Sequence, residues 1–173
     1  MALTIRDISP ADIARVHEIY CCYIGTEDVA TFEEEPPTVE EMSIRSEEIR
    51  TADFPFLCAE LSDVVVGYAY ASPFKERSAY RFSCSNSIYC DPAFVGKGVG
   101  SALLSHLLTR LKGSGMKQVV AVVGTKDDNP GTHALHMKFG FAQVALLPKI
   151  GFKNDRWIDR AYLQLDLDEY QVK

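Results

Sequence analysis

The chain has 173 residues, of which 47% are apolar and 24% are charged, and its formal net charge is −6. This length is enough to bury a substantial core and fits one domain over residues 1–173. The acidic balance argues against nucleic-acid binding, which needs clustered Lys and Arg, and no apolar run reaches the ~20 residues of a membrane span. No signal-peptide pattern begins the chain, and five cysteines without a Cys-x-x-Cys pair favour a reducing compartment, so we expect a soluble cytoplasmic protein.

The first third of the chain predicts one strand and two helices. Residues 3–6 alternate like a strand, and Ser9-Pro10 marks the start of a helix that runs to about Tyr23. The segment 31–37 ends in two prolines and cannot continue a helix, so it is expected to form a loop. Residues 38–41 have capping-box spacing and open a second helix to about Thr51.

Three strands are predicted next. The apolar runs 54–61 and 64–71 are separated by Ser62-Asp63, which is a hairpin signal. Gly67 within the second run indicates a bulge or a close backbone approach. After a loop over residues 72–78, the chain returns as a strand from Tyr80 to Cys90. These segments predict an antiparallel meander.

A glycine-rich turn follows, with glycines at positions 96, 98 and 100 ahead of a helix whose apolar residues 99, 103, 104, 107, 108 and 111 share one face. Glycine permits positive φ and leaves no Cβ between the backbone and an anion, while helix-terminal N–H groups favour phosphate. The turn therefore predicts a site for the phosphates of a nucleotide-like cofactor. It is neither a dinucleotide motif, because its spacing is Gly-x-Gly-x-Gly, nor a P-loop, because Gly98 and not Ser or Thr follows Lys97.

The last third predicts a strand, a helix and a hairpin. Glycines at 113 and 115 end the preceding helix, and residues 118–123 form a continuous apolar run, as in a strand buried on both faces. A short helix over 132–138 ends at Gly140, and residues 141–150 and 156–165 pair around a turn at 151–155. The complete order predicts an α/β or α+β fold with a mixed sheet and helices on both faces.

Several of these segments together resemble a known family. Residues 88–92, the turn at 96–100 and residues 129–141 are similar to the pyrophosphate loop and following elements of the GNAT acyl-CoA N-acyltransferases. Segments 31–33, 67–74, 79–81, 120–124 and 151–159, with Arg77 and His136, resemble the phosphinothricin and methionine sulfoximine acetyltransferase branch. The resemblance spans nearly the whole chain. It implies a twisted, mostly antiparallel sheet of about seven strands, and a homodimer that transfers acetyl from acetyl-CoA to the amino group of a small amino-acid-like substrate.

The resemblance also implies positions for the donor. The pantetheine would lie along the backbone of residues 88–90, the pyrophosphate on the amides of residues 96–101, and Lys97 would add positive charge. Asn129 would bind the pantetheine arm, or else be a plain turn residue. The candidate cofactor-binding residues are Ile88, Tyr89, Cys90, Gly96, Lys97, Gly98, Val99, Gly100, Ser101 and Asn129.

Catalytic and acceptor-binding residues are implied in the same way. His136 could donate a proton to the departing thiolate or help to deprotonate the amine, or it is a packed helix residue. The cations after Phe74 suit a carboxylate or phosphinate, with solvated surface charge as the alternative. The candidate acceptor-binding residues are Phe32, Glu33, Phe74, Lys75, Arg77, Tyr80 and Arg81. No metal-ligand spacing is present, so no metal is expected.

Two positions depart from the family pattern. Val95 replaces an Arg or Gln of the phosphate loop, which predicts weaker binding of CoA. Ser85 replaces the glutamate general base; it could relay a proton through water, or Glu33 could substitute. These changes leave a CoA-binding regulatory module with weak or lost catalysis as an alternative. An acyl-cysteine route through Cys84 or Cys90 is disfavoured because neither has an identifiable base.

Overall fold

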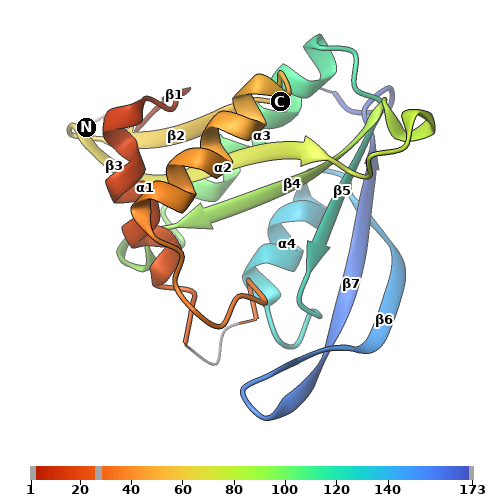
Figure 1. Cartoon of the computed structure of the whole chain (residues 1–173). Coiled ribbons are helices and arrows are strands. Elements are labelled where there is room, and N and C mark those ends of the chain that lie inside the picture. The colour runs from red at the N-terminus through yellow and green to blue at the C-terminus, as the bar shows by residue number, and fades with distance from the viewer. Residues whose placement is uncertain (1–2, 26–28, 172–173) are drawn as a thin grey trace.

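The computed structural model describes residues 3–25 and 29–171 (Figure 1). Within them, the strands form one seven-stranded sheet in the order β1-β2-β3-β4-β5-β7-β6, and every neighbouring pair is antiparallel except β4 and β5. This confirms the predicted element order and the mixed, mostly antiparallel sheet. The strands are β1 (Leu3–Asp7), β2 (Phe56–Leu61), β3 (Val64–Pro73), β4 (Ser83–Cys90), β5 (Gln118–Val123), β6 (Ala142–Lys153) and β7 (Arg156–Asp166). The α-helices are α1 (Ile13–Cys21), α2 (Val39–Thr51), α3 (Val99–Gly113) and α4 (Pro130–Lys138).

Helices cover both faces of the sheet, as expected. Alternate residues of a strand point to opposite faces, so Phe56 and Tyr68 pack with α1 and α2, whereas Leu57 and Ala69 pack with α3. The α3 side includes the predicted apolar stripe of that helix, and Phe139 at the end of α4 joins the same cluster. The sheet is therefore the middle layer of the molecule.

Local signals in the first half of the chain are confirmed. Thr38 caps α2 as predicted, because its Oγ1 accepts from the N–H of Glu41 (3.1 Å) and its own N–H donates to the Glu41 carboxylate (2.6 Å). Ser62 and Asp63 form the two-residue hairpin turn, with φ of 53° and 62°. The first helix ends at Cys21, two residues before the predicted end.

Gly67 shows both predicted features, a β-bulge and a close backbone approach. The β2–β3 register shifts between Ala59 and Glu60, opposite this glycine, which is the bulge. A Cβ at Gly67 would lie 2.9 Å from Val99 Cγ1 and 3.1 Å from the Tyr89 carbonyl oxygen. The glycine therefore lets α3 approach β3 and β4 closely.

Two further boundaries and one burial pattern differ from the predictions. The strand expected from Tyr80 begins at Ser83, because residues 78–80 form a 3-10 turn in which the Tyr80 N–H donates to the Arg77 carbonyl (2.8 Å). The last hairpin turns at Asn154 and Asp155 alone, with φ of 53° and 56°, so residues 151–153 belong to β6. Finally, β5 is not buried on both faces throughout, since Val122 is 40% exposed.

The pairing of β4 and β5 is short. Only residues 83–85 of β4 pair with residues 118–120 of β5. Beyond Ser85 the two strands diverge, as Figure 1 shows, while β3 still holds the other edge of β4 through Cys90. Residues 86–90 therefore have an edge that no strand in the described part of the chain covers, next to the turn that leads into α3.

The described residues offer neither a metal-binding cluster nor a membrane-crossing helix. No group of three or more His, Cys, Asp or Glu side chains in residues 3–25 and 29–171 is arranged to hold a metal ion. None of the helices in those ranges has the length and apolar character needed to cross a membrane.

Candidate active site

Two adjoining cavities lie where β4 and β5 diverge. The larger, of about 630 Å³, is lined by the end of β4, the glycine turn, the start of α3 and one side of α4. The smaller, of about 50 Å³, lies further back along β4 and reaches β5. They share lining residues Ala30, Ile88, Asn129 and Thr132, so one continuous groove follows the uncovered edge of β4.

The glycine turn has the backbone geometry of an anion cradle. Gly96 and Gly98 have φ of 77° and 86°, so the predicted positive φ is confirmed for these two. It is wrong for Gly100, which lies within α3; a Cβ there would be 3.2 Å from Leu135 Cδ2, so this glycine allows α4 to pack closely. Helix α3 begins at Val99, and its first N–H groups have no partner within the helix. The positive end of the α3 dipole thus faces the larger cavity.

Positive charge lies beside this turn. Lys138, the last residue of α4, lines the larger cavity, and its Nζ donates to Ser101 Oγ (3.3 Å). Lys97 lies over the Phe94 ring, with Nζ 4.8 Å from the ring centroid. Val99 is only 3% exposed and packs in the core, so only its backbone can face a ligand. The sequence analysis missed Lys138, because only the packing of α4 against α3 brings it to the turn.

The end of β4 is held from several sides. Ile88 and Cys90 line the larger cavity, and the Tyr23 hydroxyl donates to the Cys90 carbonyl.

Burial raises the pKa of the Cys90 thiol to about 11 and that of the Cys84 thiol to about 12. Both thiols are therefore protonated at neutral pH, which supports the prediction that neither is a nucleophile.

His136 is buried, with 2% exposure, and lines the smaller cavity. Its Nδ1 lies 2.9 Å from the Thr132 carbonyl oxygen, and its Nε2 lies 2.9 Å from Asn86 Nδ2. A carbonyl only accepts, so Nδ1 carries the proton and Nε2 is the acceptor of a neutral ring. Burial lowers the pKa of His136, which keeps the ring neutral. The ring can take a proton at Nε2 only when the hydrogen bond with Asn86 breaks. Asn86 is a second residue that the sequence analysis missed.

The loop before α2 is fixed beside this groove. Ala30 lines both cavities, and the Arg160 guanidinium lies 3.8 Å from the centroid of the Phe32 ring. Buried Lys153 donates to the Thr31 carbonyl (2.9 Å). Glu33 pairs with Arg45 of α2 at 2.7 Å, so its charge is neutralised. Phe32 and Glu33 therefore lie close to the groove without lining either cavity.

The other predicted acceptor residues lie elsewhere. Phe74, Lys75, Arg77, Tyr80 and Arg81 belong to the loop between β3 and β4, at the Ser83 end of β4, and none of them lines either cavity. Figure 1 shows this loop at the opposite end of β4 from the glycine turn. Ser85 is the last residue of β4 that pairs with β5, and it also lines neither cavity. One chain thus does not bring these residues together with His136.

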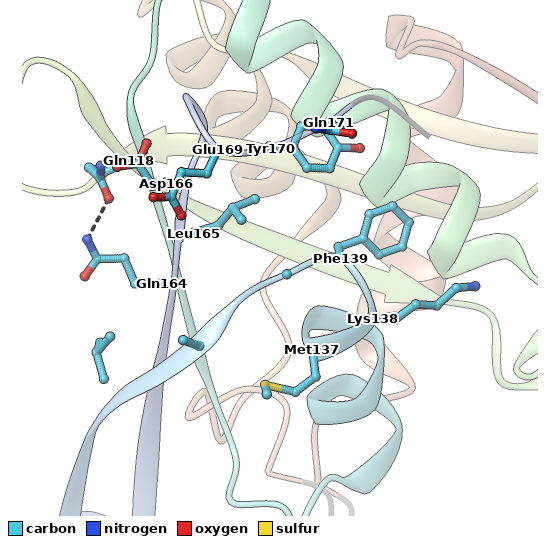
Figure 2. Close-up of a pocket in the computed structure, with 13 residues that line it drawn as sticks. Gln118, Met137, Lys138, Phe139, Gln164, Leu165, Asp166, Glu169, Tyr170 and Gln171 are labelled. Carbon is cyan, nitrogen blue, oxygen red and sulfur yellow. Dashed lines mark hydrogen bonds between the residues drawn. The ribbon is translucent and has the colours of Figure 1, made fainter.

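A third cavity, of about 790 Å³, lies between the end of α4, β5, β7 and residues 169–171 (Figure 2). Its polar residues include Gln118 and Gln164, whose side chains bond to each other at 2.7 Å, and Asp166 and Glu169. It contains none of the residues predicted for the site. Lys138 also lines it, but Asp166 and Glu169 outnumber this one lysine and disfavour phosphate, so the groove along β4 is the candidate site.

Comparison with known proteins agrees with this geometry. The profile of the Acetyltransferase (GNAT) family matches residues 14–141, a range that includes β4, the glycine turn and α4. The chain belongs to the GNAT family of acetyltransferases. A phosphinothricin N-acetyltransferase from Alcaligenes faecalis is 38% identical over 96% of this chain and 84% of that protein. An L-methionine sulfoximine/L-methionine sulfone acetyltransferase from Salmonella typhimurium is 32% identical over 97% of this chain and 96% of that protein.

Solved structures confirm the GNAT fold. A GNAT phosphinothricin acetyltransferase from Sinorhizobium meliloti, in complex with acetyl-CoA, has a TM-score of 0.92 and 41% identity, covering 100% of this chain and 92% of that one. A Salmonella typhimurium protein solved with its cofactor acetyl-CoA has a TM-score of 0.91 and 31% identity, covering 100% of this chain and 99% of that one. The resemblance read from the motifs is therefore confirmed.

Proposed function

We propose that the chain, as a single domain, is an acetyl-CoA-dependent N-acetyltransferase that acetylates the amino group of a small amino-acid-like acceptor of the phosphinothricin or methionine sulfoximine and sulfone type. The observation that carries this proposal is the continuous groove that joins the glycine turn, the uncovered edge of β4 and His136. The family match and the names of the relatives support an enzyme; they give no support to a CoA-binding module without catalysis.

In this proposal the donor follows the groove. Its pyrophosphate binds the amides of residues 96–101, with Lys97 and Lys138 as counter-charges. Its pantetheine lies along Ile88, Tyr89 and Cys90, whose uncovered edge supplies backbone hydrogen bonds as a strand partner would. Asn129 caps α4 through Oδ1, which accepts from the Thr132 N–H (3.1 Å), and this leaves its NH2 group for the pantetheine arm.

The reaction is direct attack of the bound amine on the thioester carbonyl. The N–C bond forms and the C–S bond breaks, while β4 amides polarise the carbonyl oxygen. The proton of the amine leaves to water or to His136 Nε2, which must first give up its hydrogen bond with Asn86, and the departing thiolate ends protonated. Ser85 remains the proposed position for a proton relay through water.

An amino-acid-like acceptor fits the charges near the loop at 29–33 better than a polyamine does. Lys153 and Arg160, both buried, lie against this loop, whereas the carboxylate of Glu33 is paired with Arg45. Positive charge at this place favours a carboxylate on the acceptor. Lys75, Arg77 and Arg81 lie away from the cavities of one chain, so we propose that they reach the acceptor across a subunit interface.

The proposed assembly is a homodimer formed through β6 and its neighbours. Strand β6 is a sheet edge, and the β6–β7 hairpin extends away from the rest of the sheet (Figure 1). Six exposed apolar side chains lie on β6 and β7: Val144, Leu146, Leu147, Ile150, Phe152 and Trp157. Val122 of β5 and Met137 of α4 are exposed as well. A patch of this kind on an edge strand supports an interface. Five free cysteines support the proposed cytoplasmic location.

Sedimentation of the wild type is expected to give a dimer, and Leu146→Glu is expected to give a monomer, because a charge would be buried at the interface. Val64→Glu is the control: Val64 is also exposed and apolar but lies on the far hairpin between β2 and β3, so this variant should stay dimeric. A monomeric wild type, or dissociation by both variants, would contradict the interface.

A binding and turnover comparison tests the proposed function. Acetyl-CoA should raise the melting temperature by binding the native state, and free thiol should then be released only when an acceptor is added. Methionine sulfone and phosphinothricin are expected to be acceptors, whereas the carboxamide of methionine sulfone and spermidine are expected to react much more slowly. Stabilisation without thiol release for every acceptor would favour the non-catalytic module, and preference for spermidine would overturn the acceptor class.

A further inference from the structure

The smaller cavity passes through the plane of the sheet where β4 and β5 diverge. Alternate residues of a strand point to opposite faces. The lining includes both Ile88, which packs against the core cluster under α3, and Tyr89, which packs against the cluster under α1. His136 of α4 borders the cavity on the α3 side, and the glycine turn leads into α3. In the proposed function the donor occupies that side, so the acceptor amine arrives from the α1 side.

The loop at 29–33 borders this gap on the α1 side. Ala30 lines both cavities, and the Thr31 side chain bonds to the Tyr20 hydroxyl of α1 at 2.9 Å. Phe32 follows, and it is 38% exposed. An acceptor that approaches from the α1 side therefore passes the Phe32 ring.

The β6–β7 hairpin holds this ring from two directions. The Arg160 guanidinium of β7 lies 3.8 Å from the centroid of the Phe32 ring and covers one of its faces. Gly151 of β6 meets the ring edge, where an added Cβ would lie 2.9 Å or less from three ring carbons. Nonbonded carbon atoms pack best at ~3.5–4.0 Å, so no side chain fits between them. Lys153 of the same strand donates to the Thr31 carbonyl (2.9 Å) and fixes the loop backbone.

We propose that Gly151 is a positioning residue for the acceptor, because its bare Cα seats the Phe32 ring beside the gap through which the amine reaches the thioester. The inference rests on the proposed function. Gly151 does not have a positive φ, so its backbone would accept alanine, and the contact with the ring is what requires glycine. A side chain at position 151 would push the ring out of its place.

The strand at Gly151 is held more firmly than the ring. Gly151 and the two residues after it pair with β7, and its partner Ile158 is 2% exposed. The atoms nearest to an added Cβ are outer carbons of the Phe32 ring, which can turn about the side-chain bonds. We therefore expect Gly151→Ala to fold and to displace the ring rather than β6.

Steady-state kinetics with methionine sulfone tests this inference. Gly151→Ala should lower kcat/KM by ~10-fold or more, up to the ~10²-fold that a misplacement of about 1 Å can cost. The loss should lie in KM, while kcat and the Kd for acetyl-CoA stay unchanged. Gly113→Ala is the control, because Gly113 ends α3 without a positive φ and a Cβ there would meet nothing within 4 Å. It should leave KM unchanged.

A double-mutant cycle separates the ring contact from a general disturbance of β6. Phe32→Ala removes the ring, so adding Gly151→Ala to it should change KM little. Additive losses, or the same KM for Gly151→Ala as for the wild type, would overturn the positioning role. If Gly151→Ala alone does not fold, the double variant decides: it should fold and match Phe32→Ala in KM.

Calorimetric titration of methionine sulfone into the complex with free CoA distinguishes this inference from the proposed function, because no acetyl group is present. Gly151→Ala should raise the Kd for methionine sulfone by the same factor as KM. An equal Kd for wild type and variant, or no binding at all, would overturn the inference. A raised Kd without thiol release from acetyl-CoA for any acceptor would refute the proposed function and leave the positioning role standing.

Discussion

Substitution of His136 by Gln is expected to lower kcat by ~10²–10⁴ while the Kd for acetyl-CoA stays unchanged. Gln can form hydrogen bonds but cannot hold a proton, and His136 is the titratable residue of α4 that lines the smaller cavity. The measurement is steady-state turnover with methionine sulfone, alongside calorimetric titration with acetyl-CoA. Loss of kcat with intact donor binding is the sign of a group that acts in the chemical step.

His133→Gln is the matched control, because His133 lies on the same helix and bonds to the Gln143 side chain (3.1 Å) outside the groove. The pH profile adds a second criterion. Burial holds the pKa of His136 below its ordinary value of 6.5, so the ring is neutral at pH 6.5 and above. Wild-type kcat is therefore expected to fall only when the pH drops below 6.5. Equal activity of His136→Gln and His133→Gln would remove His136 from the mechanism.

Ser85→Glu is expected to raise kcat/KM at neutral pH, by up to ~10², because a carboxylate can hold the proton that a serine cannot. Ser85 is the last residue of β4 paired with β5, so a longer side chain there begins at the point where the groove opens. By strand alternation it points to the opposite face from Asn86, toward the α1 and α2 side. It would thus add a second base rather than replace His136.

Ser83→Glu is the control for this change. Ser83 lies on the same strand and the same face, two residues before Ser85, where β4 is still paired with Gln118. The measurement is kcat/KM for each variant with a phosphinothricin-like acceptor. The same kcat/KM for Ser85→Glu as for the wild type, or an equal gain from Ser83→Glu, would mean that position 85 is not the base position.

Most of the fold could be predicted because its signals are local. The capping box at Thr38, the two-residue turn at Ser62 and the glycine at 67 each demand a particular backbone shape. The errors arise where two local solutions compete. Residues 78–80 can extend a strand or form a 3-10 turn. Gly151 can end a strand, but here it continues β6 and Phe32 packs against its Cα.

The site was predictable only in part. The glycine turn and His136 belong to short motifs, so sequence reasoning found them. Asn86 and His136 are 50 residues apart in the chain, and Lys138 is 37 residues from Ser101, so only tertiary packing shows that these pairs meet. The cations after Phe74 suit an acid group, but a pattern does not show at which end of the sheet their loop lies, so their role in binding the acceptor stays a prediction.

The most direct test of the account is mass spectrometry of the acceptor after incubation with the protein and isotope-labelled acetyl-CoA. The account predicts that the labelled acetyl group appears on the amino group of methionine sulfone or phosphinothricin in step with thiol release, and that His136→Gln slows both equally. Thiol release without labelled acceptor, or label on the protein itself in place of the acceptor, would contradict direct transfer to an amine.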